Sequence, residues 1–491
     1  MQNRILSAAV ALLATGGLTL ALAASFPDPP KVSAPAEGTA SVVLAGGCYW
    51  GMQGIFEHMK GVTNTVVGYA GGTKETAHYD MVADRNTAHA EAIRITWDPA
   101  RVTYAELLFD LVFVFAVTQI SHMLLGRFTP LGALQTTLLF LGVWWVWVYT
   151  AWITNWLNPE LTPVRVLLFS LMLGGLVLST SIPKAFESRG LWFALAYAAM
   201  QVGRTIFLLA SVPRTQPPIR MNAIRILIWL STSAVFWILG GLAEGHSRLA
   251  FWAVALAIEY LSPAARFWIP KYGASSIEDW AVEGGHMAER CAGFIIIALG
   301  ESIVVTGATF ADLAWTTETV GAFVSAFVAA IAMWWIYFHK GAEAGSEQIS
   351  RSTEPGRLAR LAYTYLHLPI VAGIILSAVA DELVLTHPAD HSDLKTVLSA
   401  IGGPLLFLVG TILFKHTIRG WLQLSHGAGI VVLAILAWFA AELSPLMLSV
   451  LTTAIMIMVA AWESISLRSD AAQSRSGKPR SEKSQSEATS A

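Results

Sequence analysis

Long apolar runs dominate the chain from Leu108 onward, and they constrain its fold more than any other feature. A segment needs about 20 consecutive, mostly apolar residues to cross a bilayer as a helix. Such runs lie near residues 108–125, 132–157, 164–182, 190–211, 221–243, 248–266, 290–309, 319–339, 358–380, 396–414, 421–440 and 443–463. The pattern predicts a mainly α, polytopic helical membrane bundle of about twelve spans over residues 108–465.

The composition agrees with a membrane protein. Of the 491 residues, 55% are hydrophobic and 13% are charged, whereas a soluble domain averages about 25% charged residues. The formal net charge of −2 gives no bulk attraction to nucleic acid. Tryptophans cluster, as in Trp144-Trp145-Val146-Trp147, and such aromatics suit the membrane interface. We therefore expect the lipid bilayer as a partner and no nucleic acid.

The two ends of the chain have patterns of their own. Residues 1–24 place Arg4 before an apolar run and end near Ala21-Leu22-Ala23, as a secretory signal peptide does. An uncleaved anchor is the alternative. Residues 25–40, rich in Pro, Ala and Ser, predict a linker. Residues 466–491 are rich in Ser, Lys and Arg with few apolar residues, and they predict a disordered tail.

Loop charges and the signal peptide disagree about topology. Lys and Arg gather in loops 263–290, 340–360 and 415–420 and in the tail, and the loops between these have few or none. Since cytoplasmic loops are enriched in Lys and Arg, we expect a multi-pass inner-membrane protein with a cytoplasmic tail. Twelve spans then place residue 107 in the cytoplasm, whereas a signal peptide would export residues 25–107. The side of this segment stays open.

Residues 41–107 alternate like a small α/β unit. Ser41–Ala45, Val62–Val67 and Glu91–Trp97 predict strands, and Tyr49–Met59 predicts a helix. A capping box, Thr103-Tyr-Ala-Glu106, precedes the next helix.

A cysteine stands at the first turn of the predicted Tyr49–Met59 helix, behind two glycines. Cys48 there would meet free N–H groups and the positive end of the helix dipole, which both stabilise a thiolate nucleophile. The motif Gly46-Gly47-Cys48-Tyr49-Trp50-Gly51 is followed by Gly68-Tyr69-Ala70-Gly71-Gly72 and His89-Ala90-Glu91-Ala92. In this order and spacing the motifs resemble the A-type peptide methionine sulfoxide reductases, over about residues 41–108.

This resemblance implies a truncated ferredoxin-like α/β segment and a set of roles. Cys48 would attack the sulfoxide sulfur and become a sulfenic acid. Tyr49 and Trp50 would hold the substrate methyl group. Glu91 would deliver the proton to the sulfoxide oxygen, which Tyr79 would help to hold.

Three departures favour an inactive remnant as the alternative. Ala88 stands where the family usually has Gly, the family's later half is absent, and no resolving cysteine follows. An active segment would need an external, thioredoxin-like thiol reductant and proteins with oxidised methionine as partners. We expect no bound cofactor and no metal. The second cysteine, Cys291, predicts a small buried apolar residue.

Two further stretches resemble the bacterial low-temperature-requirement protein A family. They are residues 106–122, beginning Glu-Leu-Leu-Phe-Asp, and residues 286–302, beginning His-Met-Ala-Glu-Arg. The resemblance covers about residues 106–465 and implies an architecture but little chemistry. The motif of this family overlaps the reductase motif at residues 106–108. Either two genes recombined at this shared sequence, which the incomplete reductase favours, or the chain is a genuine fusion.

Ionisable residues inside the apolar runs are the candidates for function in the membrane. Buried charges there are costly and tend to mark functional sites. Asp110, His286, Glu289, Arg290 and Glu301 lie in or beside the first and seventh runs. We interpret them as a proton or ion relay or a polar substrate site, with structural interhelical ion pairs as the alternative.

Helical spacing relates these residues to one another. His286, Glu289 and Arg290 share one helix face, whereas Arg290 and Glu301 are about three turns apart and cannot touch. Gly300, beside Glu301, would allow a neighbouring helix to approach closely. Asp110 and Glu301 would be counterparts if two six-helix halves were repeats. For the remaining intramembrane charges, Arg204 and Glu259, we favour a structural role.

Overall fold

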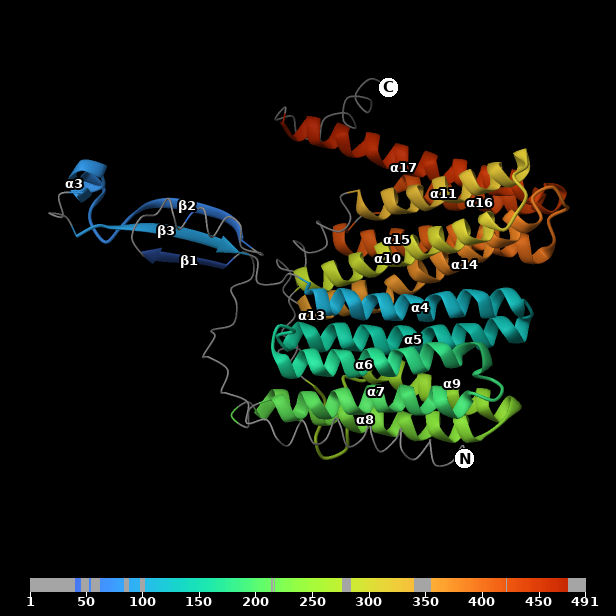
Figure 1. The fold of residues 1–491 in the computed structure, drawn as a ribbon, viewed down its shortest axis with the longest axis horizontal. Helices are drawn as coiled ribbons and strands as arrows, with labels where there is room; N and C mark the ends of the chain where they lie inside the picture. Colours follow the sequence, from blue (N-terminus) through green and yellow to red (C-terminus); the bar gives the residue numbers. More distant parts are fainter. Residues whose placement is uncertain are drawn as a thin grey trace, which may run out of the picture.

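A computed structural model describes residues 40–45, 53, 62–83, 88–97, 102–212, 215, 217–275, 284–339, 355–420 and 422–475. It contains a small β-sheet and a large helical bundle (Figure 1). The predicted signal peptide, the linker to residue 39 and the tail beyond Arg475 lie outside the described residues.

The sheet has three antiparallel strands in the order β1-β3-β2. They are β1 (Ala40–Ala45), β2 (Val62–Ala70) and β3 (Ala90–Trp97), so the three predicted strands are confirmed. A turn of 3-10 helix, η1 (Lys74–Thr76), and the short helix α3 (Tyr79–Ala83) connect β2 to β3. Of the predicted helix Tyr49–Met59, only Gln53 is described, and it is helical.

Much of the sheet's apolar surface is exposed. Val43 of β1 and Val66 of β2 are each 50% exposed, while Ile93 and Ile95 of the central strand are buried. Small sheets gain independent stability by packing an apolar face against another element. The described part of this unit therefore has a core only around its middle strand, as expected for part of a larger fold.

Twelve long helices in the described residues match the twelve predicted apolar runs one for one. They are α4 (Tyr104–Gly126), α5 (Pro130–Trp156), α6 (Thr162–Ser181), α7 (Gly190–Ser211), α8 (Pro217–Leu242), α9 (Gly245–Ala264), α10 (Gly284–Ala311), α11 (Thr317–Phe338), α14 (His367–Thr386), α15 (Leu394–Arg419), α16 (Leu424–Phe439) and α17 (Pro445–Arg475). Short elements extend or join them: η2 (Ile182–Lys184), α13 (Pro355–Ala359), the π-helical turn η3 (Arg360–Tyr365) and η4 (Ala440–Glu442).

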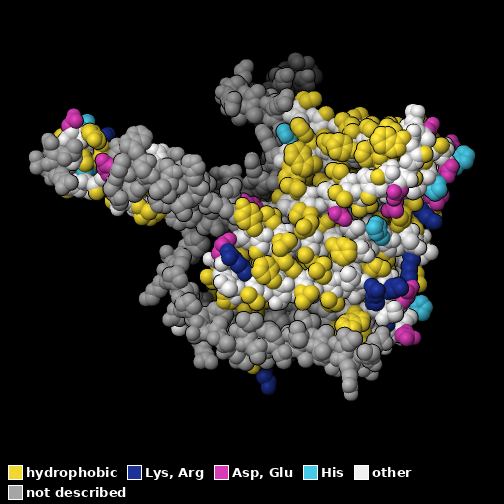
Figure 2. All heavy atoms as spheres, in the orientation of Figure 1, with side chains coloured by type: hydrophobic (Ala, Val, Ile, Leu, Met, Phe, Trp, Pro, Cys, Tyr) yellow, Lys and Arg dark blue, Asp and Glu magenta, His cyan; other side chains and the backbone are white. Residues whose placement is uncertain are grey.

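By length and apolar composition, 11 of these helices could each cross a membrane. The other is α9, which carries Arg248 and Glu259. Apolar side chains cover the flank of the bundle, and charged side chains and histidines gather near its ends (Figure 2). This distribution suits a polytopic membrane protein, because lipid tails contact the flank and water contacts the ends.

The first and last helices show how the chain enters and leaves the bundle. Thr103 caps α4, and the predicted capping box with Glu106 is present. The helix α17 continues to Arg475 and so includes the first ten residues, 466–475, of the predicted disordered tail. In Figure 1, α4 begins and α17 ends at the same end of the bundle, the end beside the sheet.

The tryptophan cluster lies in the core rather than at the membrane interface. Trp144, Trp145 and Trp147 occupy the middle of α5 and are at most 2% exposed. Interhelical hydrogen bonds explain this position: the Trp144 indole donates to the carbonyl of Thr364 at 2.8 Å, and the Trp147 indole donates to Asp110 at 2.7 Å. The expectation of interfacial tryptophans at these positions was wrong.

Glycines bring α14 and α15 into close contact. A Cβ on Gly373 would lie 2.6 Å from the backbone nitrogen of Phe407, and one on Gly403 would lie 2.4 Å from the hydroxyl of Ser377. Small residues allow membrane helices to approach closely and pack backbone against backbone. These positions fix the spacing of the two helices.

Candidate functional site

The reductase-like segment presents only part of its predicted site. Cys48, Tyr49 and Trp50 lie outside the described residues. Tyr79 lies on α3 with 65% of its surface exposed. Glu91 lies near the start of β3, paired with Tyr69 of β2, and is half-buried. No described contact brings Tyr79 and Glu91 together, so their predicted cooperation stays a prediction.

His89 organises the turn after β2, a role that the sequence motif did not reveal. Its Nδ1 accepts a hydrogen bond from the Gly72 amide at 3.2 Å, and Nε2 therefore donates to the carbonyl of Thr73 at 2.9 Å. Gly71 has a φ of 107°, and a Cβ there would lie 2.5 Å from the Ala88 carbonyl oxygen. The consecutive glycines thus allow this turn to pack against the segment before β3.

Four ionisable residues form a buried cluster between α4 and α10, which we call the ion cluster: Glu106, Asp110, His286 and Arg290. The guanidinium of Arg290 donates through Nη1 to Glu106 Oε1 at 2.8 Å and through Nη2 to Asp110 Oδ1 at 2.5 Å. His286 Nε2 lies 2.9 Å from the same Glu106 oxygen. The side chains of Glu106, Asp110 and Arg290 are fully buried, and His286 is 4% exposed. Three of the predicted residues therefore meet in one site.

Sequence reasoning assigned Glu106 only to the capping box and to the overlap of two motifs. Its carboxylate does accept from the backbone amide and hydroxyl of Thr103, at 2.9 and 3.0 Å. Its other oxygen completes the ion cluster. The available signal was the spacing, because Glu106 and Asp110 are four residues apart on α4, as are His286 and Arg290 on α10.

The helix α5 closes the cluster from a third side. Trp147 donates its indole N–H to Asp110 Oδ1 at 2.7 Å, and Asn155 Nδ2 lies 3.3 Å from His286 Nδ1. The Arg290 guanidinium also lies 5.9 Å from the centre of a Trp147 ring and 5.8 Å from that of Phe109, within reach of cation–π attraction.

The charges in the cluster do not balance when His286 is neutral. Two carboxylates face one permanently charged guanidinium, which leaves one excess negative charge in a buried site. Asp110 Oδ2 and Arg290 Nε are buried without a hydrogen-bond partner in the described part of the chain. Uncompensated buried charge is costly, so the excess negative charge of this site has to be balanced by something beyond these side-chain contacts.

Glu289 and Glu301 lie outside the cluster. Glu289 is exposed and accepts the backbone N–H of Val102 at 3.0 Å, which ties the segment before α4 to α10. Glu301 is half-buried and accepts the hydroxyl of Thr118 on α4 at 2.8 Å. Arg290 and Glu301 thus have separate partners, as predicted. The space beside Gly300 is open, so the expected close helix approach at this glycine was wrong.

Arg204 and Glu259, predicted to be structural, lie in a second buried network. Glu259 accepts hydrogen bonds from Ser233, Trp237, Tyr197 and Gln201. Arg204 does not contact Glu259 directly, because Gln201 lies between them and accepts from the Arg204 guanidinium. Arg204 also donates to Thr150 on α5 at 2.7 Å. These bonds link α5, α7, α8 and α9.

A third buried pair, which the sequence reasoning did not single out, joins α15 to α17. Lys415 Nζ lies 2.8 Å from both carboxylate oxygens of Glu463 and donates to the carbonyl of Ile336 on α11.

Near the ion cluster, Cys291 is 1% exposed and unbonded to another cysteine, which confirms the prediction of a small buried residue.

Comparison with known proteins identifies the family to which the helical bundle belongs. The family model described as bacterial low temperature requirement A protein (LtrA) matches residues 101–461. An uncharacterised protein of Rhizobium meliloti (strain 1021) is 41% identical over 372 residues, which are 76% of this chain and 91% of that protein.

The segment in front matches a different family. The model described as peptide methionine sulfoxide reductase matches residues 40–121. Peptide methionine sulfoxide reductase MsrA 2 of Mesorhizobium japonicum is 51% identical over 73 residues, which are 15% of this chain and 37% of that protein. The enzyme of the same name from Synechocystis is 49% identical over 87 residues, 17% of this chain and 41% of the enzyme. The chain therefore spans about two fifths of the reductases it matches.

No solved structure matches the chain. Both family matches include the first half of α4, where Glu106 and Asp110 lie. Since the first match covers most of the chain, the protein belongs to the bacterial low temperature requirement A family, as a polytopic membrane bundle preceded by a methionine sulfoxide reductase-like fragment.

Proposed function

We propose that the chain is a proton-coupled, transporter-like protein of the inner membrane, and that the ion cluster binds the coupling proton. The observation that carries this proposal is that two fully buried carboxylates, Glu106 and Asp110, face a single buried guanidinium, that of Arg290. Intramembrane ionisable groups of this kind mark proton relays in pumps and transporters.

The geometry supplies a physical reason for coupling. A proton on Asp110 would weaken its ion pair with Arg290, and a proton on His286 would strengthen its bond to Glu106. Either change alters how tightly α4 and α10 hold each other. A two-state movement of these helices would then depend on protonation, as conformational coupling requires.

The test is proton binding, which requires no knowledge of the transported substrate. The detergent-solubilised protein is taken from pH 8.5 to pH 5.5, and the carboxylic acid band is followed by infrared difference spectroscopy. We expect a band that is lost in Asp110→Asn or shifted in His286→Gln. The matched control is Glu187→Gln, since Glu187 forms an exposed ion pair with Arg127 in the loops.

A functional measurement follows in liposomes loaded with a pH-sensitive dye. Proton uptake driven by a membrane potential should fall in Asp110→Asn and His286→Gln, and should not fall in Glu187→Gln. If Asp110→Asn and His286→Gln both match the wild type in band and uptake, the cluster is a structural ion pair. The alternative of a stress-adaptive membrane protein without transport would then stand.

A second candidate function is thiol-dependent reduction of methionine sulfoxide, in which Cys48 is the nucleophile and Glu91 the proton donor. It is favoured by the retained motifs and by the His89-ordered turn. Against it stand the exposed sheet and the match to only two fifths of each reductase. The partners would be proteins with oxidised methionine and a thioredoxin-like reductant, with no bound cofactor.

This second function is tested by reduction of methyl p-tolyl sulfoxide with dithiothreitol as the reductant. An active segment requires that Cys48→Ser abolish turnover and that Glu91→Gln lower it. Equal rates of sulfoxide reduction by the wild type and Cys48→Ser would show that the segment is an inactive remnant.

A further inference from the structure

One carboxylate oxygen of Asp110 lies beside a glycine. Asp110 Oδ1 accepts the hydrogen bonds from Arg290 and Trp147. The other oxygen, Oδ2, is buried and has no hydrogen-bond partner among the described residues. A Cβ on Gly293 of α10 would lie 4.0 Å from this Oδ2. The unpaired oxygen of the ion cluster is therefore next to a residue without a side chain.

Gly293 leaves room at the surface of the bundle. The glycine is partly exposed. Outside its own helix, the nearest described atom to a Cβ there would be Leu107 Cδ2 at 3.7 Å. A methyl group would fit in this space, and a water molecule is of similar size. We call this place, between Leu107, Gly293 and Asp110 Oδ2, the Gly293 notch.

The notch has a polar neighbour toward one end of the bundle only. Glu289, one turn before Gly293 on the same helix face, is an exposed carboxylate. Beyond Gly293 the face continues with Ile296, 50% exposed, and Val304, 64% exposed. The helices α4 and α10 both begin at the end of the bundle beside the sheet (Figure 1), and Gly293 lies about 14 Å from the start of α10. The notch is thus reached from the sheet end.

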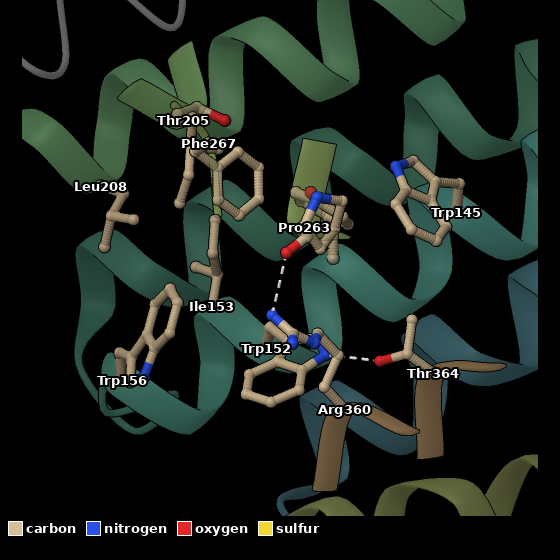
Figure 3. Close-up of a pocket in the computed structure, with 12 residues that line it drawn as sticks. Trp145, Trp152, Ile153, Trp156, Thr205, Leu208, Pro263, Phe267, Arg360 and Thr364 are labelled. Carbon is tan, nitrogen blue, oxygen red and sulfur yellow. Dashed lines mark hydrogen bonds between the residues drawn. The ribbon is translucent and has the colours of Figure 1, made fainter. Parts of the chain in front are cut away.

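The helix α5 closes the cluster on the other side. Trp147 faces the cluster and covers Asp110 Oδ1 with its indole. On the opposite side of the helix, Trp145, Trp152 and Trp156 line a pocket whose other walls are mainly apolar (Figure 3). A polar route to Asp110 is therefore favoured between α4 and α10, at the notch, and not through α5.

The charges around Asp110 favour a proton at this oxygen. The charged and titratable groups that face it are Glu106 on its own helix, Arg290 and Cys291 on α10, and His286 through Glu106. On the neighbouring helices α14 and α6, His367 and Arg165 have other partners. A metal cation takes about six oxygen ligands, whereas the notch offers one carboxylate oxygen and an apolar wall. A proton requires only that one oxygen.

We infer that Asp110 takes up and releases its proton through the Gly293 notch, with water from the sheet end of the bundle as the carrier. In uptake, a hydronium ion in the notch gives its proton to Oδ2 and leaves as water; release is the reverse. Glu289 concentrates cations at the mouth of the notch, and Leu107 narrows it. Gly293 is then the residue that determines access. This inference rests on the proposed binding of a proton by the ion cluster.

The experiment measures how fast Asp110 exchanges its proton. A film of the full chain in detergent at pH 5.5 is perfused with D2O, and the shift of the Asp110 carboxylic acid band is followed by infrared spectroscopy. Gly293→Val fills the notch and should slow the exchange at least about tenfold, because exchange then waits for a local opening of the helices. Gly293→Ala fits without displacing its neighbours and should slow it less. Leu107→Ala widens the notch and should speed it up.

The matched control is Gly300→Val. Gly300 is also a partly exposed glycine of α10, and no described atom lies within 4 Å of a Cβ there. This variant should exchange its Asp110 proton as fast as the wild type. Thermal unfolding of each variant in the same detergent checks that the fold is intact.

A second measurement tests the notch without a proton. The two cysteines of the chain are removed by Cys48→Ser and Cys291→Ala, and Gly293→Cys or Gly300→Cys is added. In nanodiscs, the cationic reagent 2-(trimethylammonium)ethyl methanethiosulfonate should modify Gly293→Cys at least about tenfold faster than Gly300→Cys, because the reactive thiolate forms in water and not against lipid. Adding Glu289→Gln should slow the modification of Gly293→Cys.

The outcomes separate this inference from the proposed function. A wild type without an Asp110 band would overturn proton binding by the cluster, and the thiol labelling then decides whether water reaches the notch. Exchange in Gly293→Val as fast as in the wild type would overturn the inference while leaving proton binding intact. Modification of Gly293→Cys no faster than that of Gly300→Cys would also overturn it.

Discussion

At the scale of single residues, Arg290 is the side chain on which the ion cluster depends. It is the only Lys or Arg in contact with Glu106 and Asp110 among the described residues. Removing one partner of a buried ion pair costs about 3–5 kcal/mol, because the other charge stays buried and unpaired. We expect Arg290→Gln to lower the free energy of unfolding by this amount, measured by denaturant titration in mixed micelles.

The double variant Asp110→Asn, Arg290→Gln sharpens this prediction. Removing Asp110 as well takes away one of the two carboxylates left without the guanidinium, so the double variant should be more stable than Arg290→Gln alone. A double variant that loses the sum of both single losses would contradict the charge argument.

Two tryptophans on the same helix allow a matched comparison of hydrogen bonds. Trp147 donates to the carboxylate of Asp110, and Trp144 donates to the backbone carbonyl of Thr364. Hydrogen bonds to charged groups contribute about 1.5–3 kcal/mol, and neutral ones about 1 kcal/mol. We expect Trp147→Phe to destabilise the protein more than Trp144→Phe by about 1 kcal/mol. Equal losses would show that Asp110 is neutral in the folded protein.

The residues of the ion cluster were predictable only in part. Asp110, His286 and Arg290 stand out because charge is rare in apolar runs. Glu106 was missed because its position at N3 of α4 already explained it as a capping residue. Sequence periodicity assigns residues to a face of their own helix, but it does not say which faces of different helices meet. The position of Trp147 against Asp110 was unpredictable for this reason.

At the scale of elements, the glycines of α14 and α15 give a direct test of helix packing. A Cβ on Gly373 would meet backbone atoms of α15, which cannot move without displacing the helix. We expect Gly373→Ala to lower the apparent melting temperature in detergent by several degrees. The control is Gly300→Ala, where the space is open and alanine favours the helix by up to about 1 kcal/mol. A Gly373→Ala protein as stable as Gly300→Ala would exclude this close approach.

The cap of α15 gives a prediction with a pH dependence. Asp393 accepts from the Thr396 backbone N–H at 2.9 Å, which lowers the pKa of its carboxyl below the usual 3.8. A carboxyl with a lowered folded-state pKa stabilises the protein above pH 3.8. This stabilisation is lost as the pH falls through the folded-state pKa. We expect Asp393→Ala to cost about 1 kcal/mol near pH 7 and much less near pH 3, by unfolding in detergent. A cost that does not change with pH would contradict the cap.

The elements themselves were largely predictable, since each of the twelve apolar runs corresponds to a helix. Their hydrophobicity is a property of composition alone, and a helix satisfies its own backbone in lipid. The π-helical turn η3 was not predictable, because Thr364 is held there by Trp144 and Trp152, more than 200 residues earlier in the chain.

At the scale of the whole molecule, both family models match the first part of α4. The same part of the helix carries Glu106 and Asp110 of the ion cluster. The helix is continuous through the overlap at residues 106–108, so a joint at this string leaves the membrane bundle whole. The reductase-like segment instead corresponds to only about two fifths of each reductase compared, and Val43 and Val66 of its sheet are exposed.

The membrane topology of the whole chain can be tested directly. The helices α4 to α17 cross the bundle an even number of times, and both outer ends lie on one side (Figure 1). Reporter domains fused after residues 100 and 470 should therefore report the same compartment, and loop charges predict that this is the cytoplasm. A fluorescent protein reports a cytoplasmic fusion point, and alkaline phosphatase reports an exported one.

The same fusions decide between the loop charges and the signal peptide. Export of the segment before α4 requires an odd number of crossings between the two points, and α9, with buried Arg248 and Glu259, is then the helix that fails to span. A phosphatase active at residue 100 and inactive at residue 470 would therefore overturn the twelve-span topology. It would also place Cys48 where only an exported thiol reductant reaches it. Cytoplasmic reporters at both points would instead give Cys48 access to the cytoplasmic thiol pool.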